Sequence, residues 1–133
     1  MRPALFMLLL LLVGCTESAL KAEEPVWGKQ ACAHCAMLVS EKPPAAQLIT
    51  SEGKRKFFDD LGCMVAFEER EHPKVTARWV RDPRGEGWAD PATTHFSGGH
   101  KTPMDFGFLP DVQGIVNFDE LRGVVLQKRE GER

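Results

Sequence analysis

The sequence has no excess of basic residues, and it lacks the common catalytic motifs. Its 133 residues carry 17 Lys and Arg against 19 Asp and Glu, a formal net charge of -2. A chain without a basic stripe cannot neutralise a row of phosphates, so nucleic acid is not an expected partner. Neither a Ser/His/Asp order, nor a phosphate-binding glycine loop, nor a His-x-x-x-His pair stands out. We therefore predict that the chain is not an enzyme.

Long apolar runs are also missing after the first fifteen residues. The chain starts with Met1-Arg2-Pro3, continues with an apolar stretch from Ala4 to Val13, and reaches a Leu-x-Gly-Cys sequence that ends at Cys15. A basic start, a short apolar run and small residues before a cleavage point are typical of an export signal. We predict residues 1–14 as a lipoprotein signal peptide, Cys15 as the lipidated residue and residues 15–26 as a tether. An ordinary secretory signal with a chance cysteine is the alternative.

This signal predicts a location in the periplasm or cell envelope, with the chain anchored to a membrane by lipid on Cys15. Several acyl chains give firm attachment, and the choice between inner and outer membrane stays open. If the sulfur of Cys15 carries lipid, three cysteines remain as thiols: Cys32, Cys35 and Cys63. An odd number of thiols in an oxidising compartment cannot all pair within the chain, so at least one is free, bound to metal or paired between molecules.

An internal repeat indicates the fold. Residues 58–65 and 118–125 share the pattern Phe-Asp-acid-Leu-x-x-x-Val. In each copy an aspartate can cap the amino end of a helix, because its carboxylate accepts hydrogen bonds from free backbone amides. We predict one helix from about Asp60 to about Glu71, ending before Pro73. A second helix should run from Glu120 to about Arg129.

Short β-like runs precede both predicted helices. Residues 51–54, Ser-Glu-Gly-Lys, suit the turn of a β-hairpin. The predicted strands are 46–50 and 55–58 in the first half, and 77–80 and 113–117 in the second, while residues 81–111 should be mostly loop with one short strand near 94–96. This order predicts an α+β fold in which two similar ββα(β) units, about 27–73 and 74–133, pack into one small domain after the signal and tether.

The segment Cys32-Ala33-His34-Cys35-Ala36-Met37 is the strongest chemical feature. Thiolate and thioether sulfur prefer Cu(I) over hard ions such as Mg²⁺. If Cys35 to Met37 is extended, the side chains at 35 and 37 project to the same face and one ion can contact both sulfurs. We predict Cys35 and Met37 as metal ligands.

A pair of ligands leaves Cu(I) under-coordinated, so a third ligand should come from elsewhere. Met104 is the best candidate, because it lies in a polar loop where a core methionine is not expected. His34 and His100 are weaker candidates. Cys63 lies on the first predicted helix and is expected to be a small buried residue or a disulfide partner of Cys32, and it is a further candidate ligand.

Two other interpretations of the cysteines stay open. Cys32 and Cys35 have the Cys-x-x-Cys spacing of a thiol-disulfide oxidoreductase, but Pro43-Pro44 would end a following helix almost at once. Zinc is the second alternative, with Cys32, Cys35, Cys63 and a histidine as four ligands. A c-type haem is excluded, because position 36 is not histidine.

Together, these motifs resemble the NosL family of nitrous oxide reductase accessory lipoproteins. The resemblance rests on an ordered set of residues that extends over nearly the whole mature chain: Cys15, Cys32-x-x-Cys35-x-Met37, Ala45-Ala46-Gln47, Phe58-Asp59-Asp60-Leu61-Gly62-Cys63-Met64, Trp88-Ala89-Asp90-x-x-x-x-His95-Phe96 and Thr102-Pro103-Met104. Two positions depart from the family pattern, since Ala36 and Asp105 stand where glycine is common. The substitution at Asp105 affects the expected backbone of its loop.

The resemblance implies a periplasmic, lipid-anchored Cu(I) chaperone with its copper-binding domain in residues 27–133. By this resemblance, the metal ligands are Cys35, Met37 and Met104. The implied partners are a membrane ABC-type assembly complex and nitrous oxide reductase, whose copper centres the chaperone would help to build. Similar lipoproteins also handle copper more generally in the cell envelope, so a general copper-binding lipoprotein is the alternative.

Overall fold

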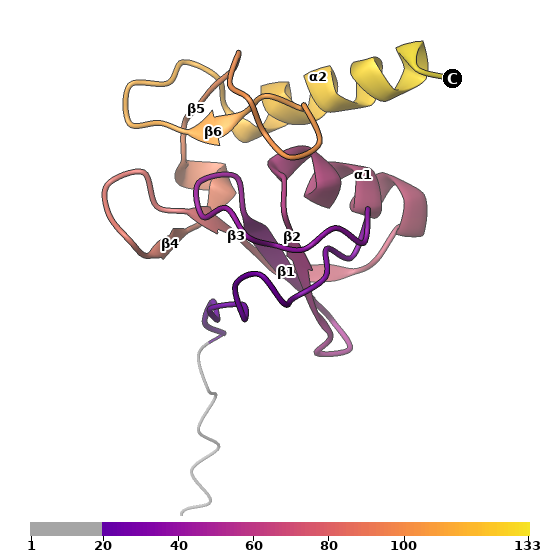
Figure 1. Cartoon of the computed structure of the whole chain (residues 1–133), viewed down its shortest axis with the longest axis vertical. Helices are drawn as coiled ribbons and strands as arrows, with labels where there is room; N and C mark the ends of the chain where they lie inside the picture. Colours follow the sequence, from indigo (N-terminus) through magenta and orange to yellow (C-terminus); the bar gives the residue numbers. More distant parts are fainter. Residues whose placement is uncertain (1–19) are drawn as a thin grey trace, which may run out of the picture.

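The computed structural model describes residues 20–133, so the predicted signal peptide and Cys15 lie outside the described residues. The described part contains two α-helices, a short 3-10 helix (Pro91–Thr93) and two β-sheets, which make up an α+β fold as predicted. Figure 1 shows the larger sheet on one side of the first helix and the second helix on the other. Between residues 20 and 133, no helix is both long and apolar enough to cross a bilayer.

The larger sheet is built on a hairpin with the predicted bounds. β1 (Ala46–Thr50) and β2 (Arg55–Phe58) pair in antiparallel fashion. Gly53, in the turn between them, has a φ of 78°, a conformation that glycine adopts without a steric penalty. β3 (Val75–Arg81) pairs with the other edge of β1, and β4 (Trp88–Ala89) completes the order β2-β1-β3-β4. β3 thus extends the predicted strand 77–80 at both ends and belongs to the sheet of the first hairpin.

The smaller sheet differs from the prediction. It consists of β5 (Phe96–Ser97) and β6 (Leu109–Pro110), so the short strand lies slightly after the expected residues 94–96. The strand predicted at residues 113–117 is wrong: in the described part of the chain this segment makes only a single bridge, between Val116 and Phe96. The physical reason is a turn, in which the Gly114 amide donates to the carbonyl of Asp111 at 3.0 Å.

Helix α1 (Leu61–Glu71) is buried along most of its length. Asp60 caps it as predicted, with its carboxylate accepting a hydrogen bond from the Gly62 amide at 3.0 Å. The helix ends at Glu71, with His72 as its C-cap, before Pro73. Every residue from 61 to 68 is buried, because α1 lies between the larger sheet and α2 (Figure 1). Residues at the start of α1 are therefore held from both sides.

Helix α2 (Phe118–Gly131) begins two residues before the predicted start. Its cap is Asn117, whose side chain accepts from the Glu120 amide at 2.9 Å, while the Glu120 carboxylate accepts from the Asn117 amide at 2.9 Å. This reciprocal pair is a capping box. The prediction that an aspartate caps this helix, in parallel with Asp60, is therefore wrong.

Glu68 connects the three layers. Its buried carboxylate accepts two hydrogen bonds from Arg78 of β3, at 2.8 and 2.6 Å, and one from Arg122 of α2 at 3.4 Å. A bidentate arginine–carboxylate pair has a defined geometry as well as a favourable energy. The negative charge of Glu68, in the buried part of α1, is thus compensated by an arginine of β3 on one side and an arginine of α2 on the other.

The last residues of the predicted tether are attached to the domain. Glu23 and the Gln47 side chain exchange two hydrogen bonds, at 3.0 and 2.7 Å. The Glu24 carboxylate accepts from Arg81 at 2.8 Å and from the Trp88 indole at 2.7 Å. Residues 23 and 24 of the predicted tether therefore pair with polar groups of the larger sheet.

Candidate metal centre

Residues 30–39 form a small hairpin that presents the Cys-x-x-Cys segment. Its ends are joined by a bridge between Ala31 and Leu38, and the Cys32 amide donates to the carbonyl of Met37 at 2.8 Å. Ala36 has a φ of 65°, in the left-handed region. Residues 35–37 therefore do not have the extended conformation under which side chains 35 and 37 would project to the same face, because the loop must turn back on itself within six residues. Glycine adopts a left-handed φ at a lower conformational cost than alanine does, so glycine would be less strained at position 36.

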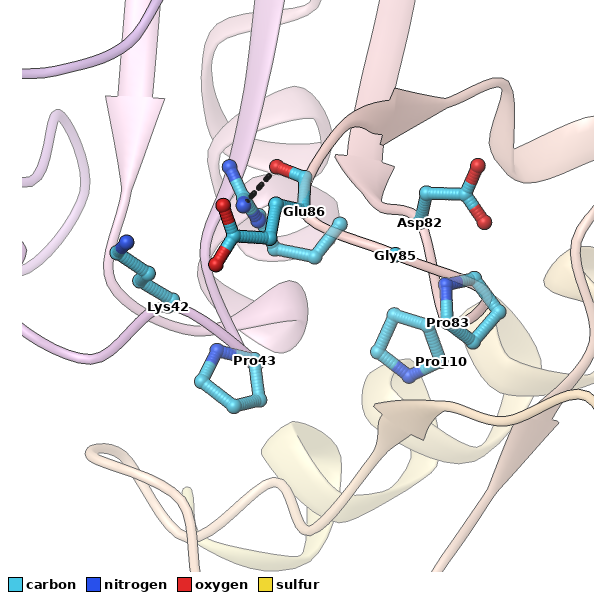
Figure 2. A pocket seen from close by; sticks show the side chains of 8 residues that line it. Lys42, Pro43, Asp82, Pro83, Gly85, Glu86 and Pro110 are labelled. Atoms are coloured by element: carbon cyan, nitrogen blue, oxygen red, sulfur yellow. Dashed lines mark hydrogen bonds between the residues drawn. The ribbon is translucent and has the colours of Figure 1, made fainter.

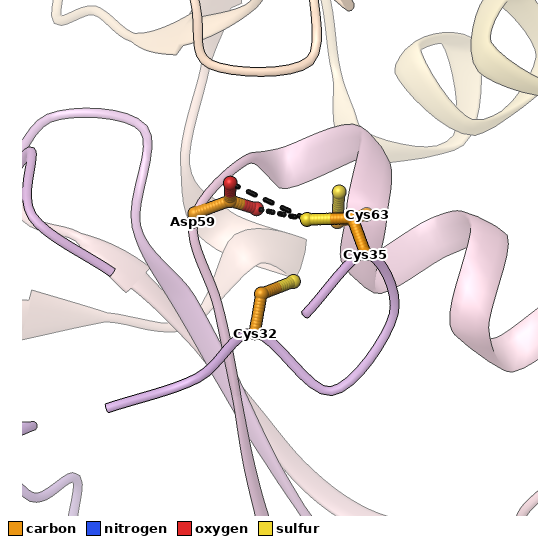
Figure 3. Close-up of side chains that lie close together, drawn as sticks. All are labelled: Cys32, Cys35, Asp59 and Cys63. Atoms are coloured by element: carbon orange, nitrogen blue, oxygen red, sulfur yellow. Dashed lines mark hydrogen bonds between the residues drawn. The ribbon is translucent and has the colours of Figure 1, made fainter. Parts of the chain in front are cut away.

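This loop brings Cys32 and Cys35 to the amino end of α1. The ligand atoms of Cys32, Cys35, Asp59 and Cys63 all lie within 4.8 Å of one another. Figure 3 shows the three thiols and the Asp59 carboxylate close together, with the carboxylate facing the Cys35 sulfur. Cys32, Asp59 and Cys63 are buried, whereas Cys35 is partly exposed and forms the accessible side. Chain elements that are distant in sequence thus supply one compact group of four candidate ligands, which we call the sulfur cluster.

The sulfur cluster differs from the predicted zinc site in its fourth member. The expected ligand was a histidine, and the structure places Asp59 there instead. Asp59 follows β2 directly and is almost fully buried at 1% exposure. Asp59 was not predicted as a ligand, because an aspartate before a helix cap is usually explained by local hydrogen bonds. Its position next to Asp60, at the junction of a strand and a helix, was the available signal.

Hydrogen bonds decide where protons reside in the sulfur cluster. The Cys35 thiol donates to the two Asp59 oxygens, at 3.3 and 3.4 Å. Burial raises the pKa of Cys35 to about 12. The side-chain hydrogen bond with Cys63 lowers the pKa of Cys32 to about 6, and the same contact together with burial raises the pKa of Cys63. Hydrogen bonds from its neighbours thus make Cys32 the most acidic thiol of the metal-free cluster.

The Met104 loop is fastened to the same end of α1. The Met104 amide donates to the carboxylate of Asp60 at 3.0 Å, so the helix cap also holds this loop. The ring of Phe106 lies directly against Gly62, where any Cβ atom would collide with it. Asp105 adopts a left-handed φ of 56°. The loop therefore keeps its turn without the glycine common in the family pattern.

Cys35 and Met104 are consequently attached to two neighbouring residues. Asp59 accepts the hydrogen bond from the Cys35 thiol, and Asp60 accepts that from the Met104 amide. Met37 and Met104 remain exposed, by 50% and 36%. The predicted ligands Cys35, Met37 and Met104 thus lie in two loops that adjoin the amino end of α1, with the thiol partly covered and the two methionines open to solvent.

The two candidate histidines lie outside the sulfur cluster. His34 Nδ1 is 3.2 Å from a guanidinium nitrogen of Arg70, and burial followed by the charge of Arg70 lowers the pKa of His34. His100 Nε2 pairs with the Ser97 hydroxyl at 2.8 Å. The Cys-x-x-Cys segment also lacks a following helix, since residues 33–35 form a turn. The Cys-x-x-Cys segment thus does not itself begin a helix, as it does in thioredoxin-like proteins, and the helix end that it adjoins belongs to α1, later in the chain.

A hollow of about 250 Å³ lies elsewhere on the surface, beside the loop that follows β3 (Figure 2). None of its lining residues belongs to the sulfur cluster or carries sulfur, and Arg81 in its wall donates to the carbonyl of Glu86. It is lined by Lys42, Pro43, Arg81, Asp82, Pro83, Gly85, Glu86 and Pro110. Rigid prolines and charged side chains without a converging polar set give this hollow no defined chemistry.

The fold and the sulfur cluster define a class, a small α+β protein that gathers soft ligands at a helix amino terminus. The NosL family model matches residues 25–104, more than half of the chain, and the chain belongs to the NosL family. The structure is similar to the crystal structure of the copper chaperone NosL from Shewanella denitrificans, with a TM-score of 0.59 and 18% sequence identity over 80% of this chain and 87% of that chain. At this identity the likeness shows a common fold. No curated protein matches the chain.

Proposed function

We propose that this protein is a copper chaperone that carries Cu(I) on Cys35, Met37 and Met104 and performs no catalysis. Membership of the NosL family supports the proposal, as does the similarity to the crystal structure of a protein described as a copper chaperone. The chemistry of the ligands agrees, because one thiolate and two thioethers form a soft donor set that suits Cu(I).

The observation that carries the proposal is the pair of adjacent aspartates before α1. Asp59 contacts the Cys35 thiol and Asp60 contacts the Met104 backbone, so ligands 69 residues apart are held at one helix end. Neither contact uses the sulfur of Met104 or that of Met37. Both thioethers therefore stay available to a metal ion.

The exposure of the two methionines suits transfer rather than storage. A ligand from a partner protein can reach an ion held by Met37 and Met104 from the solvent side, because both side chains are open. The incoming ligand can bind before the old ligands leave, so copper need not pass through free solution. Cys35 would be the last contact to break, since it lies deepest of the three.

We further propose that lipid on Cys15 anchors the protein on the periplasmic or envelope side of a membrane. The predicted signal peptide and the Leu-x-Gly-Cys sequence that ends at Cys15 support this location. The proposed partners are a membrane ABC-type assembly complex and nitrous oxide reductase, whose copper centres the chaperone would supply. The resemblance of the sequence motifs to accessory lipoproteins of that enzyme supports this choice.

An anaerobic titration tests the copper proposal. The reduced full chain would be titrated with Cu(I) against a chromogenic chelator of known affinity, and in parallel with Zn(II). Cys35→Ser should lose most of the Cu(I) affinity, and Met37→Ala and Met104→Ala should each weaken it. Leu38→Ala is the matched control, because Leu38 is 52% exposed and lies next to Met37 but offers no ligand.

Each competing function has its own outcome in the same set of measurements. Tighter binding of Zn(II) than of Cu(I) would contradict the proposal and favour a zinc lipoprotein. Reduction of insulin disulfides that depends on both Cys32 and Cys35 would favour an oxidoreductase. Copper-deficient nitrous oxide reductase in cells that lack this chain would support the proposed client, and fully loaded enzyme in those cells would contradict it.

A further inference from the structure

The sulfur ligands of the centre fall into a buried set and an exposed set that meet at Cys35. Cys32 and Cys63 are 3% and 0% exposed, whereas Met37 and Met104 are 50% and 36% exposed. Cys35 is partly exposed and lies between the two sets. A three-coordinate ion on Cys35, Met37 and Met104 leaves the buried thiols of Cys32 and Cys63 without a metal.

The buried set is already arranged for an ion of its own. A metal–sulfur bond of about 2.3 Å places three sulfurs around one ion about 4 Å apart. Cys32, Cys35 and Cys63 have their ligand atoms within 4.8 Å of one another. Cys63 lies in the first turn of α1 and Cys32 is held by the hairpin hydrogen bond to Met37. Both positions therefore come from ordered backbone that is fixed before a metal arrives.

We propose that the protein binds two Cu(I) ions, with the Cys35 sulfur as a ligand common to both. The inner ion is held by Cys32, Cys35 and Cys63, and the outer ion by Cys35, Met37 and Met104. This inference rests on the proposed function for the outer ion. It adds a second metal position that uses Cys32 and Cys63, the two thiols that copper transfer at the surface does not require.

Charge gives a reason for two ions instead of one. Three thiolates around one monovalent ion leave two negative charges uncompensated in a site that is mostly buried, and uncompensated buried charge is costly. A second Cu(I) on the shared Cys35 sulfur removes one of these charges. Asp59, which accepts the Cys35 hydrogen bond in the metal-free protein, loses that donor when the thiol binds metal. The buried Asp59 carboxylate is then a further group that positive charge in the cluster would stabilise.

The two positions should differ in how easily they release copper. The outer ion has two exposed thioether ligands, so an external ligand can displace it directly. The inner ion has two buried ligands, Cys32 and Cys63, which an external ligand cannot reach directly. A chelator should therefore remove one equivalent quickly and the second at least tenfold more slowly. The slow equivalent would keep the loop at residues 32–37 in place while the outer ion is exchanged.

Copper stoichiometry tests the inference. The full chain would be purified in detergent, with Cys15→Ser in every sample so that the fourth cysteine contributes no thiol. Reduced protein would be titrated with Cu(I) alone under a competing chelator, and its copper X-ray absorption recorded. The expected result is two Cu(I) per chain with a copper–copper distance in the spectrum. Cys32→Ala and Cys63→Ala should each lower the stoichiometry from two to one and remove the slow phase of release.

The controls keep folding and metal binding apart. Met64→Leu is the matched control for Cys63→Ala, because Met64 is equally buried and also carries sulfur but is not part of the sulfur cluster. It should keep two Cu(I) per chain. Circular dichroism shows whether each alanine variant is folded. If Cys63→Ala unfolds, Cys32→Ala alone decides, since Cys32 lies in the hairpin of residues 30–39 and outside the helices.

One Cu(I) per chain, unchanged by Cys32→Ala, would overturn the inner position while leaving the copper-chaperone function intact. One Zn(II) that fills the cluster and is not displaced by Cu(I) would also overturn it. If the protein with all its cysteines and methionines intact showed no preference for Cu(I) over Zn(II), the proposed function itself would be contradicted. The two failures are therefore distinguishable.

Discussion

Asp60 joins the helix cap to the Met104 loop, and Asp60→Asn separates these two roles. The Asp60 carboxylate is fully buried and accepts from the Gly62 and Met104 amides, both at 3.0 Å. Asparagine caps helices as well as aspartate does, so the contact with Gly62 can survive. The second oxygen becomes an amide group that cannot accept from Met104. The variant therefore tests the loop attachment with the cap preserved.

The structure sets the size of the expected effect. A hydrogen bond to a charged acceptor contributes about 1.5–3 kcal/mol, and its loss leaves the Met104 amide facing another donor. We expect the free energy of unfolding to fall by about 2–3 kcal/mol in Asp60→Asn. Released from its anchor, the Met104 loop must be ordered again when copper binds. A cost of about 1.4 kcal/mol for this ordering would weaken Cu(I) binding about tenfold.

Urea unfolding measures the first quantity, and an anaerobic competition titration measures the second. Asp90→Asn is the control, because Asp90 is an exposed cap that accepts from the Ala92 amide at 2.8 Å away from the sulfur cluster. It should change stability by about 0.5 kcal/mol at most and leave copper affinity unchanged. If Asp60→Asn lowers stability but binds Cu(I) as tightly as the unmodified protein, the attachment of Met104 does not contribute to the metal site, and the reasoning is wrong.

Three further predictions concern the Cys35 thiol, the contact of Gly62 with Phe106 and the lipid anchor on Cys15. Because burial raises the pKa of Cys35 to about 12, copper must displace a proton from this thiol at neutral pH. The apparent Cu(I) affinity should therefore rise with pH, about tenfold per pH unit for each proton released. A flat affinity profile between about pH 6 and 8 would contradict this prediction. Gly62→Ala should lower the melting temperature, with a loss of about 1–3 kcal/mol, because its Cβ collides with Phe106; unchanged calorimetry would refute that contact. Cys15→Ser should abolish lipid attachment, measured by mass spectrometry and membrane fractionation, and a variant still carrying acyl chains would exclude Cys15 as the modified residue.

Local signals made the first half of the fold predictable. The turn around Gly53, the cap at Asp60 and the stop before Pro73 each act on their immediate neighbours, and the hairpin and α1 have the expected positions. The second half was less predictable. Asn117 and Asp119 are both good caps, and only the reciprocal contact between Asn117 and Glu120 decides between them.

The sequence alone indicated which atoms are suited to a soft metal, because the affinity of sulfur for Cu(I) is a property of Cys35, Met37 and Met104 themselves. Their placement was a different matter. Ala36 turns the loop in a left-handed conformation, against the extended form that spacing suggested. Asp59 and Cys63 enter the centre because β2 and α1 bring them beneath the Cys32–Cys35 loop. Ligand chemistry is local to a residue, whereas the gathering of ligands depends on contacts between segments far apart in the chain, and only the packed structure determines those.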